Sequence, residues 1–410
     1  MKRPHTLYIC YFGIREPLVQ TQVLPYLREI QKANIEVSIL TFEPQPGPWE
    51  SHIRTSLSDE GIDWHSLKYH KRFSVLATAY DVFRGTAFAR RFIAKHKPAI
   101  LHGRIHVPTL MAALGRKLSS HKPKLLFDIR GFFPEEYTDA GVWPVDGWLY
   151  RSVKKVERWL LKEADGFVVL TNKARDILFP EAGESGTEKN GRPVEVIPCC
   201  VDLDKFGEAD LEARNQVRRE LGIGDRTAIA YVGSFGSWYL TDEMIDFFVA
   251  ARERDPNTFV LVLTQRDRER VRATLLARGL DESDLFVGSV GPDEVPRYLN
   301  AADVSVSFIK ACYSKLSSSP TKIAEYLACG LPVISNRGIG DVDELLETRR
   351  VGALLDDFSP GSYWSALDEV EKLDGIEAVC REAATLEFDL NDVAGERYRR
   401  IYHRLLSRTK

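Results

Sequence analysis

The 410-residue chain has no apolar run approaching the roughly 18–20 residues that a membrane-spanning helix requires. Its first residues, MKRPHTLYICYFG, lack the long apolar segment and small-residue cleavage site of a signal peptide. These absences predict a globular protein located in the cytoplasm. A chain of this length exceeds what one hydrophobic core usually supports, so we expect two domains.

Cysteines and clustered metal ligands are also scarce. The six cysteines form no CxxC pair and show no regular spacing, which is typical of reduced thiols in a cytosolic protein. Cys199 and Cys200 are adjacent, but no second pair is present to complete a metal site. The sequence therefore predicts no bound metal and no cofactor.

Charge is spread unevenly along the chain. Residues 1–200 contain 29 Lys and Arg against 22 Asp and Glu, a balance of +7, whereas residues 201–410 contain 27 against 37, a balance of −10. A basic first half suits an anionic membrane surface or an acidic acceptor. Its cations are scattered without interleaved aromatic residues, so we do not expect nucleic-acid binding.

Strand-like and helix-like segments alternate along the whole chain. Apolar strands at 6–12, 35–42 and 99–102 alternate with helical spacing, as over 19–32, while 43–60 is interpreted as a loop and a polar stretch. This pattern predicts an α/β fold of two doubly wound, Rossmann-like parallel sheets that face each other across a cleft. We assign residues 1–205 to the first domain, rejoined by a C-terminal helix at 390–410, and residues 206–389 to the second.

The segment 317–336, SSSPTKIAEYLACGLPVISN, carries its own helix signals. Ser319 is expected to be the N-cap and Pro320 the first helical residue. A helix start attracts anions, Lys322 adds a cation there, and Glu325 lies one turn deeper. The arrangement suits a phosphate beside a hydroxyl-bearing sugar, although an ordinary capped helix with solvated side chains has the same signals.

Ligands of doubly wound sheets bind at the carboxyl ends of the strands. In the first half, the polar and glycine positions in those loops give a set with acid, base and hydrogen-bonding groups: Gly13, Glu16, Gln20, His102, Arg104, His106, Asp128, Arg130 and Glu135. In the second half, the corresponding loops give a phosphate-compatible set: Gly233, Ser234, Phe235, Gly236, Arg266, Val290, Ser317, Ser318, Ser319, Thr321, Lys322 and Glu325.

The sequence resembles a known family through PTKIAEYLACGLPVI, supported by EADGFVVLTNKARDIL (163–178), VEVIPCCVDLDKF (194–206), IAYVGS (229–234) and RYRRIYHRL (397–405). These stretches are similar to the retaining nucleotide-sugar glycosyltransferases of family 4. The resemblance implies the GT-B fold and a metal-independent transfer of a sugar from a UDP- or GDP-linked donor to a hydroxyl. It also implies that the first-half set lies on the acceptor side, that the second-half set binds the donor, and that Glu325 binds the donor ribose.

Several positions depart from the family pattern. The first of two glutamates spaced eight positions apart falls on Ser317. The Arg and Lys that usually bind the diphosphate are replaced by Ser234 and Tyr239. We therefore expect the diphosphate to be bound by the 233–236 turn, the helix start at 321, Lys322 and Arg266.

The first domain departs as well. A histidine expected near the reacting sugar is replaced by Arg130, and His102 or His106 could serve instead. Arg130 could alternatively form an ion pair with Asp128 or with a glutamate at 135 or 136. We predict that Glu325, Lys322, His102 and Arg130 are catalytic. The basic segment 148–162 is either a helix that covers the next strand or an interfacial membrane helix.

The resulting hypothesis is transfer to a glycan or lipid-linked acceptor in polysaccharide or glycolipid biosynthesis, with peripheral contact at the inner face of the membrane. One alternative is a sugar-nucleotide epimerase or isomerase, which would need an acid/base pair such as His106 and Glu135. Another is a non-catalytic partner subunit, which the lost Arg/Lys pair and first glutamate would favour.

Overall fold

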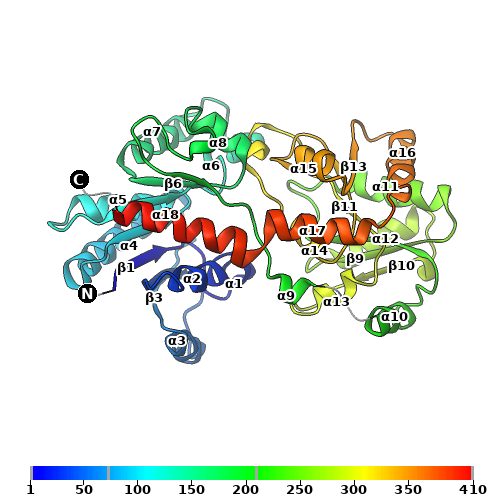
Figure 1. Cartoon of the computed structure of the whole chain (residues 1–410), viewed down its shortest axis with the longest axis horizontal. Coiled ribbons are helices and arrows are strands. Elements are labelled where there is room, and N and C mark those ends of the chain that lie inside the picture. Colours follow the sequence, from blue (N-terminus) through cyan, green and yellow to red (C-terminus); the bar gives the residue numbers. More distant parts are fainter. Residues whose placement is uncertain (1–2, 72–73, 208–210, 408–410) are drawn as a thin grey trace. The chain divides into compact units, whose positions relative to one another are not determined.

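The computed structural model describes residues 3–71, 74–207 and 211–407, which fold into two compact units (Figure 1). The first unit runs to Pro198 and resumes at Asn391, and the second spans Cys199–Leu390. The division precedes the expected boundary at 205 because the amide of Val201 donates to Phe388 O at 2.9 Å, and the amide of Leu390 donates to Val201 O at 3.0 Å. These bonds attach the connecting segment to the second unit.

A seven-stranded parallel sheet in the order β3-β2-β1-β4-β5-β6-β7 forms the centre of the first unit. Its strands are β1 (His5–Ile9), β2 (Glu36–Glu43), β3 (Ile62–Lys68), β4 (Ile100–Arg104), β5 (Lys124–Asp128), β6 (Gly166–Val169) and β7 (Val194–Val196). Its helices are α1 (Pro17–Gln22), α2 (Leu24–Gln31), α3 (Trp49–Asp59), α4 (Ser74–His96), α5 (His106–Lys117), α6 (Phe133–Asp139), α7 (Trp148–Glu163), α8 (Asn172–Leu178) and α18 (Glu396–Ser407). The strand order reverses between β1 and β4, so the crevice at their carboxyl ends is the expected ligand position.

The second unit contains a six-stranded parallel sheet in the order β10-β9-β8-β11-β12-β13. Its strands are β8 (Thr227–Val232), β9 (Thr258–Leu263), β10 (Leu285–Gly288), β11 (Val304–Ser307), β12 (Val333–Asn336) and β13 (Gly352–Leu355). Its helices are α9 (Leu203–Phe206), α10 (Leu211–Glu220), α11 (Thr241–Arg254), α12 (Arg268–Ala277), α13 (Val295–Leu299), α14 (Thr321–Ala328), α15 (Val342–Arg349), α16 (Pro360–Glu371) and α17 (Ile376–Phe388). Here the order reverses between β8 and β11.

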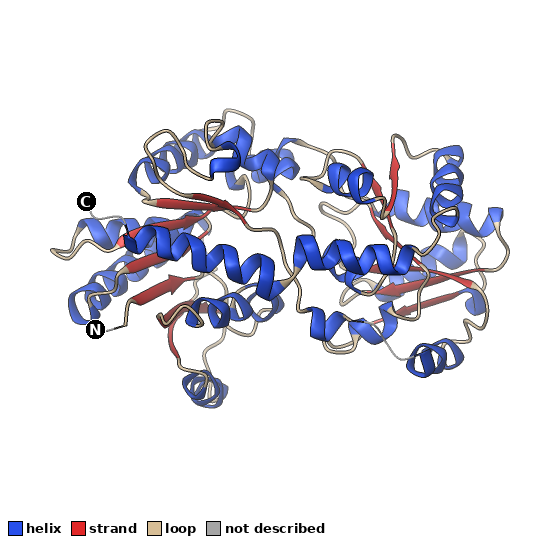
Figure 2. Ribbon diagram, in the orientation of Figure 1, coloured by secondary structure: helices blue, strands red, loops and turns tan. Residues whose placement is uncertain are grey.

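Both sheets are covered by helices, as Figure 2 shows, and both are apolar on their two faces. In β8, Ala228 and Ala230 belong to one core cluster while Ile229 and Tyr231 belong to the cluster on the opposite face. Successive side chains of a strand point to opposite faces, so a doubly covered strand needs an unbroken apolar run. The predicted fold class, two doubly wound parallel-sheet units, is confirmed.

Two local expectations for the first unit were wrong. The helix predicted over 19–32 is broken into α1 and α2 at Val23, because Pro25 lies in the first turn of α2 and cannot donate a backbone hydrogen bond to a preceding turn. The polar stretch within 43–60 contains α3, whose buried residue is Leu57. Within the described residues, none of the helices combines the length and apolar character that a membrane span requires.

The basic C-terminal helix α18 belongs to the first unit. Its apolar face is buried at Tyr398, Ile401, Tyr402 and Leu405, and it packs on α2 and β7. The Tyr402 hydroxyl lies 2.9 Å from His102 Nδ1 and 3.2 Å from Thr6 Oγ1. This hydroxyl therefore joins the last helix to the centre of the first sheet.

Substituting Tyr402 with phenylalanine is expected to destabilise the first unit by about 1–3 kcal/mol, because the buried His102 ring loses a hydrogen-bond partner. Urea denaturation followed by circular dichroism measures the change. Tyr80→Phe, on a half-exposed tyrosine of α4, is the control and should shift stability by less than about 0.5 kcal/mol. Equal effects of the two substitutions would contradict a structural role of the Tyr402 hydroxyl.

Candidate active site

The helix α14 starts beside the reversal point of the second sheet, and its first turn differs from the prediction. Pro320, not Ser319, is the N-cap residue, and no side chain caps the helix. The Ser319 hydroxyl instead accepts the backbone N–H of Cys199 at 3.0 Å. The tyrosine hydroxyl of Tyr326 accepts the amide of Val232 at 2.8 Å, which holds α14 against the end of β8. The helix start is thus left open and fixed in place.

Lys322 is the most unusual residue of this turn. Its side chain is 7% exposed, and its ammonium lies 4.2 Å from the ring centre of Tyr231 and 4.0 Å from that of Tyr239. In the part of the chain that the structure describes, this buried ammonium has no hydrogen-bond partner. Burial lowers the pKa of Lys322 to about 7, against the opposing effect of the Glu325 carboxylate. Because this ammonium contacts aromatic faces and forms no hydrogen bond within the described residues, its N–H donors are available to an anion.

Glu325 lies one turn deeper in α14 and is partly exposed. Burial raises the pKa of its carboxyl to about 7, while the nearby cations Lys322 and Lys205 oppose the rise. Within the described residues, this carboxyl forms neither a hydrogen bond nor an ion pair. It is therefore available to accept hydrogen bonds from a ligand.

The turn after β8 forms the opposite wall. Gly233 has a φ of +141°, and a Cβ there would lie 2.7 Å from Lys322 Nζ, so only glycine allows the ammonium to lie so close to this turn. The amide of Gly236 donates to Thr241 Oγ1 at 2.8 Å, which removes it from the predicted anion-binding set. The Tyr231 hydroxyl donates a hydrogen bond to the backbone oxygen of Ser234, and the Phe235 ring packs on the Tyr231 ring.

The remaining donor-side residues lie around this centre with different degrees of access. Ser317 is buried and donates to Ser314 O at 2.7 Å, while Ser318 and Thr321 are partly exposed. Arg266 is exposed at the end of β9. The carbonyl oxygen of Val290 accepts the side-chain amide of Gln265 at 2.6 Å, which fixes the loop after β10.

The first unit contains a cavity of about 380 Å³ at its own reversal point. Residues that follow β1, β2, β3 and β4 line it together with parts of α4, α5 and α6: Tyr11, Phe12, Gly13, Glu16, Phe42, Pro44, Tyr69, Thr78, Arg104, Ile105, Val107, Pro108, Phe133 and Tyr137. Ile105 has φ +66° and ψ −179°, a conformation that costs a β-branched residue free energy and is found most often at functional sites. We refer to this cavity as the aromatic pocket.

Three of the predicted acceptor-side residues line the aromatic pocket, namely Gly13, Glu16 and Arg104. The loop that carries the first two is fixed from both sides. Glu43 accepts the amide of Ile14 at 2.9 Å, and Gln20 donates to Ile14 O at 2.6 Å. Gln20 therefore holds the loop rather than lining the pocket.

His102, Asp128 and Arg130 form a buried polar network instead. Asp128 is fully buried, 3.5 Å from His102 Nε2 and 3.8 Å from Arg130 Nε. Burial disfavours the charge of Asp128, but Arg130, His102 and Arg104 outweigh it and lower the pKa of the carboxyl. For His102, burial disfavours the charged imidazolium and so lowers the pKa of the ring. Neither His102 nor Arg130 lines the aromatic pocket, and Arg130 lies at ion-pair distance from Asp128 as the alternative interpretation expects; a catalytic role of the two residues stays a prediction.

His106 and Glu135 are also engaged elsewhere. His106 Nε2 lies 2.9 Å from Glu157 Oε2, whereas Glu135 binds Lys154 Nζ at 2.9 Å and accepts the Tyr150 hydroxyl at 3.1 Å. The two residues are therefore not paired with each other. Helix α7, which carries Glu157 and Lys154, packs on α5 and β5, in agreement with the interpretation that this basic helix covers the sheet.

Sequence reasoning missed most of the aromatic pocket. Its aromatic lining includes Tyr11, Tyr69 and Tyr137, none of which was among the predicted site residues. Tyr11 donates to Asp81 Oδ2 at 2.7 Å, and His70 Nδ1 lies 2.6 Å from the other oxygen of that fully buried carboxylate. The missed signal was positional for Tyr11 and Tyr69, since each follows a strand that ends at the ligand-binding edge of the sheet, whereas Tyr137 lies within α6.

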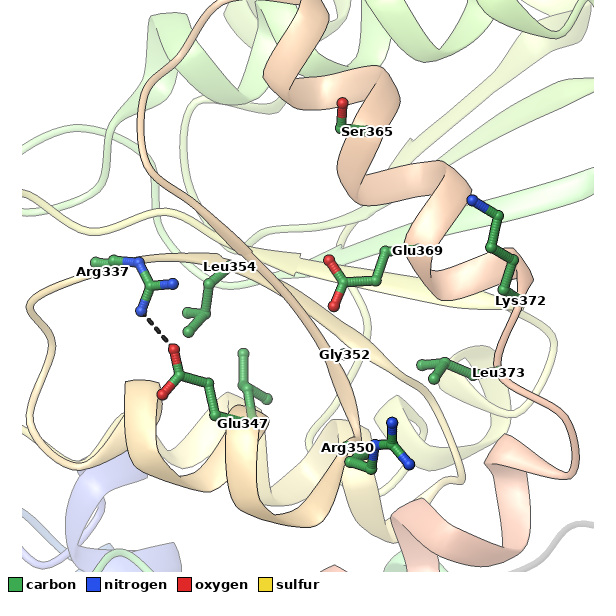
Figure 3. Close-up of a pocket in the computed structure, with 10 residues that line it drawn as sticks. Arg337, Glu347, Arg350, Gly352, Leu354, Ser365, Glu369, Lys372 and Leu373 are labelled. Atoms are coloured by element: carbon green, nitrogen blue, oxygen red, sulfur yellow. Dashed lines mark hydrogen bonds and ion pairs between the residues drawn. The ribbon is translucent and has the colours of Figure 1, made fainter.

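A second cavity, of about 550 Å³, lies along the edge strand β13 between α15 and α16 (Figure 3). Arg337 and Glu347 form an ion pair at 2.7 Å in its lining, and Arg350, Glu369 and Lys372 add further charged side chains. None of the predicted site residues lines this cavity. Among the described residues, no group of three or more His, Cys, Asp or Glu is arranged to hold a metal ion.

Two family models match the chain in succession. Glycosyltransferase Family 4 matches residues 19–205, and Glycosyl transferases group 1 matches residues 213–387. The chain belongs to the family 4-like glycosyltransferases. The Lys322–Glu325 turn therefore lies in the group 1 domain of this glycosyltransferase, and the aromatic pocket lies in its family 4 domain.

Curated relatives of this glycosyltransferase are distant. The 2-deoxystreptamine glucosyltransferase of Streptomyces kanamyceticus is 26% identical over 202 residues, 48% of each chain. The alpha-monoglucosyldiacylglycerol synthase of Streptococcus pneumoniae is 26% identical over 225 residues, 53% of this chain and 48% of that protein. The chain thus matches about half the length of each of these relatives.

Solved structures agree on the fold along the whole chain. A glycosyltransferase from Rickettsia africae has a TM-score of 0.74 at 15% identity and covers 100% of both chains. Anabaena HepE in complex with UDP and glucose has a TM-score of 0.68 at 16% identity and covers 99% of this chain and 100% of its own. The architecture of this glycosyltransferase is that of the GT-B fold.

Proposed function

We propose that this protein transfers a sugar from a nucleotide diphosphate sugar to a hydroxyl of a glycan or lipid-linked acceptor, with retention at the anomeric carbon. The bond from the anomeric carbon to the diphosphate breaks, the bond to the acceptor oxygen forms, and the acceptor proton leaves with the diphosphate or to solvent. The nucleotide sugar is a co-substrate and no metal or other cofactor takes part. The product would belong to polysaccharide or glycolipid biosynthesis at the cytoplasmic side of a membrane.

The unpartnered ammonium of Lys322 is the observation that carries this proposal. A leaving diphosphate needs positive charge and N–H donors that are already in position. Lys322, the open start of α14 and the turn after Gly233 supply these groups at one place in the second unit. Tyr239 occupies the position where the family usually has a lysine, and its ring instead lies over the ammonium of Lys322. One cation from the helix thus takes the place of cations usually supplied by the β8 turn.

Glu325 supports the donor assignment because a carboxylate one turn from the phosphate site can accept the ribose hydroxyls. The base would lie toward the loop of Val290, which Gln265 holds. Among the solved structures, Anabaena HepE is complexed with UDP-glucose, which makes a uridine donor the first to test.

The aromatic pocket supports the proposed binding of the acceptor in the first unit. Aromatic rings stack on the apolar faces of sugars and contact apolar carriers, while Glu16 and Arg104 can orient a hydroxyl. This lining is unlike that of a site for a small, highly charged metabolite. Of the two alternatives, the isomerase lacks support because His106 and Glu135 have other partners.

Calorimetric titration and product analysis test the proposal together. A panel of UDP- and GDP-linked sugars is titrated into the full chain, and each binder is then incubated with and without membrane lipid extract or oligosaccharide acceptors. We expect binding of at least one donor and a glycosylated product only when an acceptor is present. Conversion of the donor without an acceptor would indicate the isomerase, and no binding of any donor would indicate the non-catalytic subunit.

A further inference from the structure

The strand β13 forms one edge of the second sheet. Among the described residues it pairs with β12 alone, and the carbonyl groups of Val351 and Leu355 accept amides from that side at 3.0 and 3.4 Å. Alternate residues of a parallel strand bond to the same neighbour, so the N–H and C=O groups of Gly352 and Leu354 point away from β12. Within the described residues these groups form no hydrogen bond. The edge therefore offers backbone donors and acceptors to another strand.

The cavity of about 550 Å³ beside β13 leaves this edge open, and we call it the edge groove. Gly352 and Leu354 both line it, and because glycine has only backbone atoms, the backbone of β13 itself faces the groove. Leu346 of α15 belongs to the core cluster on one face of the sheet, and Leu367 of α16 belongs to the cluster on the other. The two helices thus flank the edge from opposite faces without covering it (Figure 3).

The strand lacks the features that usually protect a free edge from pairing. Natural edge strands are commonly interrupted by proline, by a bulge or by a charged side chain within the strand. Residues 351–355 of this chain are VGALL, with no proline and no charge. The charges lie instead beyond the two ends of the strand, where they can select a partner rather than exclude one.

The end of the groove where β13 begins is basic. Figure 3 shows Arg350 and Lys372 toward the Gly352 end of the strand, with Glu369 between them and the other end. Within the part of the chain that the structure describes, the side chains of Arg350 and Lys372 form neither a hydrogen bond nor an ion pair. Both cations are therefore available to acids of a partner.

The end of the groove where β13 finishes is acidic. Arg337 there binds both Glu347 at 2.7 Å and Asp356 at 2.6 Å, so two acids share one cation. Asp357 follows as a third acid. The strand thus carries opposite net charges at its two ends, which is the arrangement that lets an antiparallel copy of the same strand match it at both ends.

The other edge strand of this sheet does not have this pattern. Glu282 and Asp284 lie directly before β10, and residues 289–296 after it contain no Lys or Arg. Antiparallel pairing of two copies of β10 would place these acids opposite a segment without cations. Complementary charge therefore distinguishes β13 from β10 as an edge for self-pairing.

We propose that β13 pairs with β13 of a second copy of this chain, antiparallel about a twofold axis, so that the two sheets become continuous. In the register centred on Ala353, Gly352 of one copy lies opposite Leu354 of the other, and their outward N–H and C=O groups bond to each other. The same register places Arg350 opposite Asp356 of the second copy, and the twofold axis repeats the contact. This inference goes beyond the proposed function and does not depend on it.

Sedimentation equilibrium of the full chain over a range of micromolar concentrations tests the pairing. We expect the wild type to dimerise, and Arg350→Glu or Asp356→Lys alone to weaken dimerisation by at least about tenfold, because each reversal places like charges opposite each other twice. An equimolar mixture of the two variants should dimerise as the wild type does, since the new acid of one then faces the new base of the other. Such recovery cannot arise if the variants are misfolded.

Two further variants complete the test. Leu354→Pro removes an outward N–H that the ladder with β12 does not use, and its ring blocks a second strand, so this variant should be monomeric. Arg270→Glu, on an exposed cation of α12 that has no side-chain partner within the described residues, is the matched control and should dimerise normally. Circular dichroism should show the helical content of the wild type in every variant.

Three results would overturn the proposal. The first is a wild-type chain that stays monomeric at all concentrations. The second is a dimer that persists in Leu354→Pro or in both charge reversals, which would assign dimerisation to another surface. The third is a mixture of Arg350→Glu and Asp356→Lys that associates no better than each variant alone, which would contradict the antiparallel register.

Discussion

Replacing Lys322 with methionine is expected to lower kcat/KM for the nucleotide sugar by about 100-fold or more, a loss comparable to that from removing one preorganised charge-stabilising group. The leaving diphosphate develops charge as the glycosidic bond breaks, and Lys322 is the buried cation at this helix start. With Ser234 and Tyr239 at the usual cationic positions, no neighbouring side chain on the β8 turn replaces it. Steady-state kinetics with the donor identified by calorimetry measures the loss.

The same variant should keep or increase the stability of the fold, which separates binding from structure. Methionine fills a similar volume and removes a buried ammonium without a hydrogen-bond partner. Burial lowers the pKa of Lys322 from 10.5 to about 7, so between these pH values the unfolded chain holds a proton that the folded chain lacks. Wild-type stability should therefore rise from pH 7 to pH 10, by on the order of 4 kcal/mol, and Lys322→Met should remove that rise.

Glu325 gives folding stability the opposite dependence on pH, in the acidic range. Burial raises the pKa of its carboxyl from 4.5 to about 7, so its contribution to stability is present below pH 4.5 and is lost as the pH rises toward 7. The Lys322→Met variant should show the same loss of stability as the pH rises toward 7, which provides an internal control. Full activity in Lys322→Met, or a loss of activity matched by unfolding, would contradict the role of Lys322 at the diphosphate.

Replacing Glu325 with alanine is expected to weaken binding of the nucleoside diphosphate by about 10- to 100-fold, which is the value of one lost charge-assisted hydrogen bond. The carboxyl is partly exposed and unpaired within the described residues, so the substitution breaks no ion pair. Calorimetry measures the dissociation constant. Glu382→Ala, on an exposed glutamate of α17 in the same unit, is the matched control and should bind as the wild type does.

A deoxyribose ligand tests the assigned contact directly. If Glu325 accepts a ribose hydroxyl, the 2′-deoxy or the 3′-deoxy nucleoside diphosphate should bind the wild type as weakly as Glu325→Ala binds the ribose form. The same deoxy ligand should lose nothing further in Glu325→Ala, because the two changes remove one hydrogen bond. Additive losses for both deoxy ligands would show that Glu325 does not touch the ribose.

The sequence by itself determined the architecture of two doubly wound parallel sheets. Segments with strand-like and helix-like patterns of apolar residues alternate along the chain. A parallel sheet covered on both faces is the arrangement that buries such unbroken apolar strands. The SSSPTKIAEYLACG segment could be located at a strand end because proline, glycine and serine act through local backbone geometry. Even there, the cap was wrong, since Ser319 bonds to the amide of Cys199, far away in the sequence.

Only the tertiary structure decided what each side chain does at these strand ends. Lys322 was predicted as a cation at the helix start, and the structure adds that the rings of Tyr231 and Tyr239, from another strand and loop, enclose it. His102 and Arg130 had the right chemistry for catalysis and are nevertheless buried around Asp128. Access, pKa and pairing depend on groups that come together only when the sheet assembles. Local sequence fixes backbone geometry within a few residues, whereas the environment that tunes a functional group is set by long-range contacts.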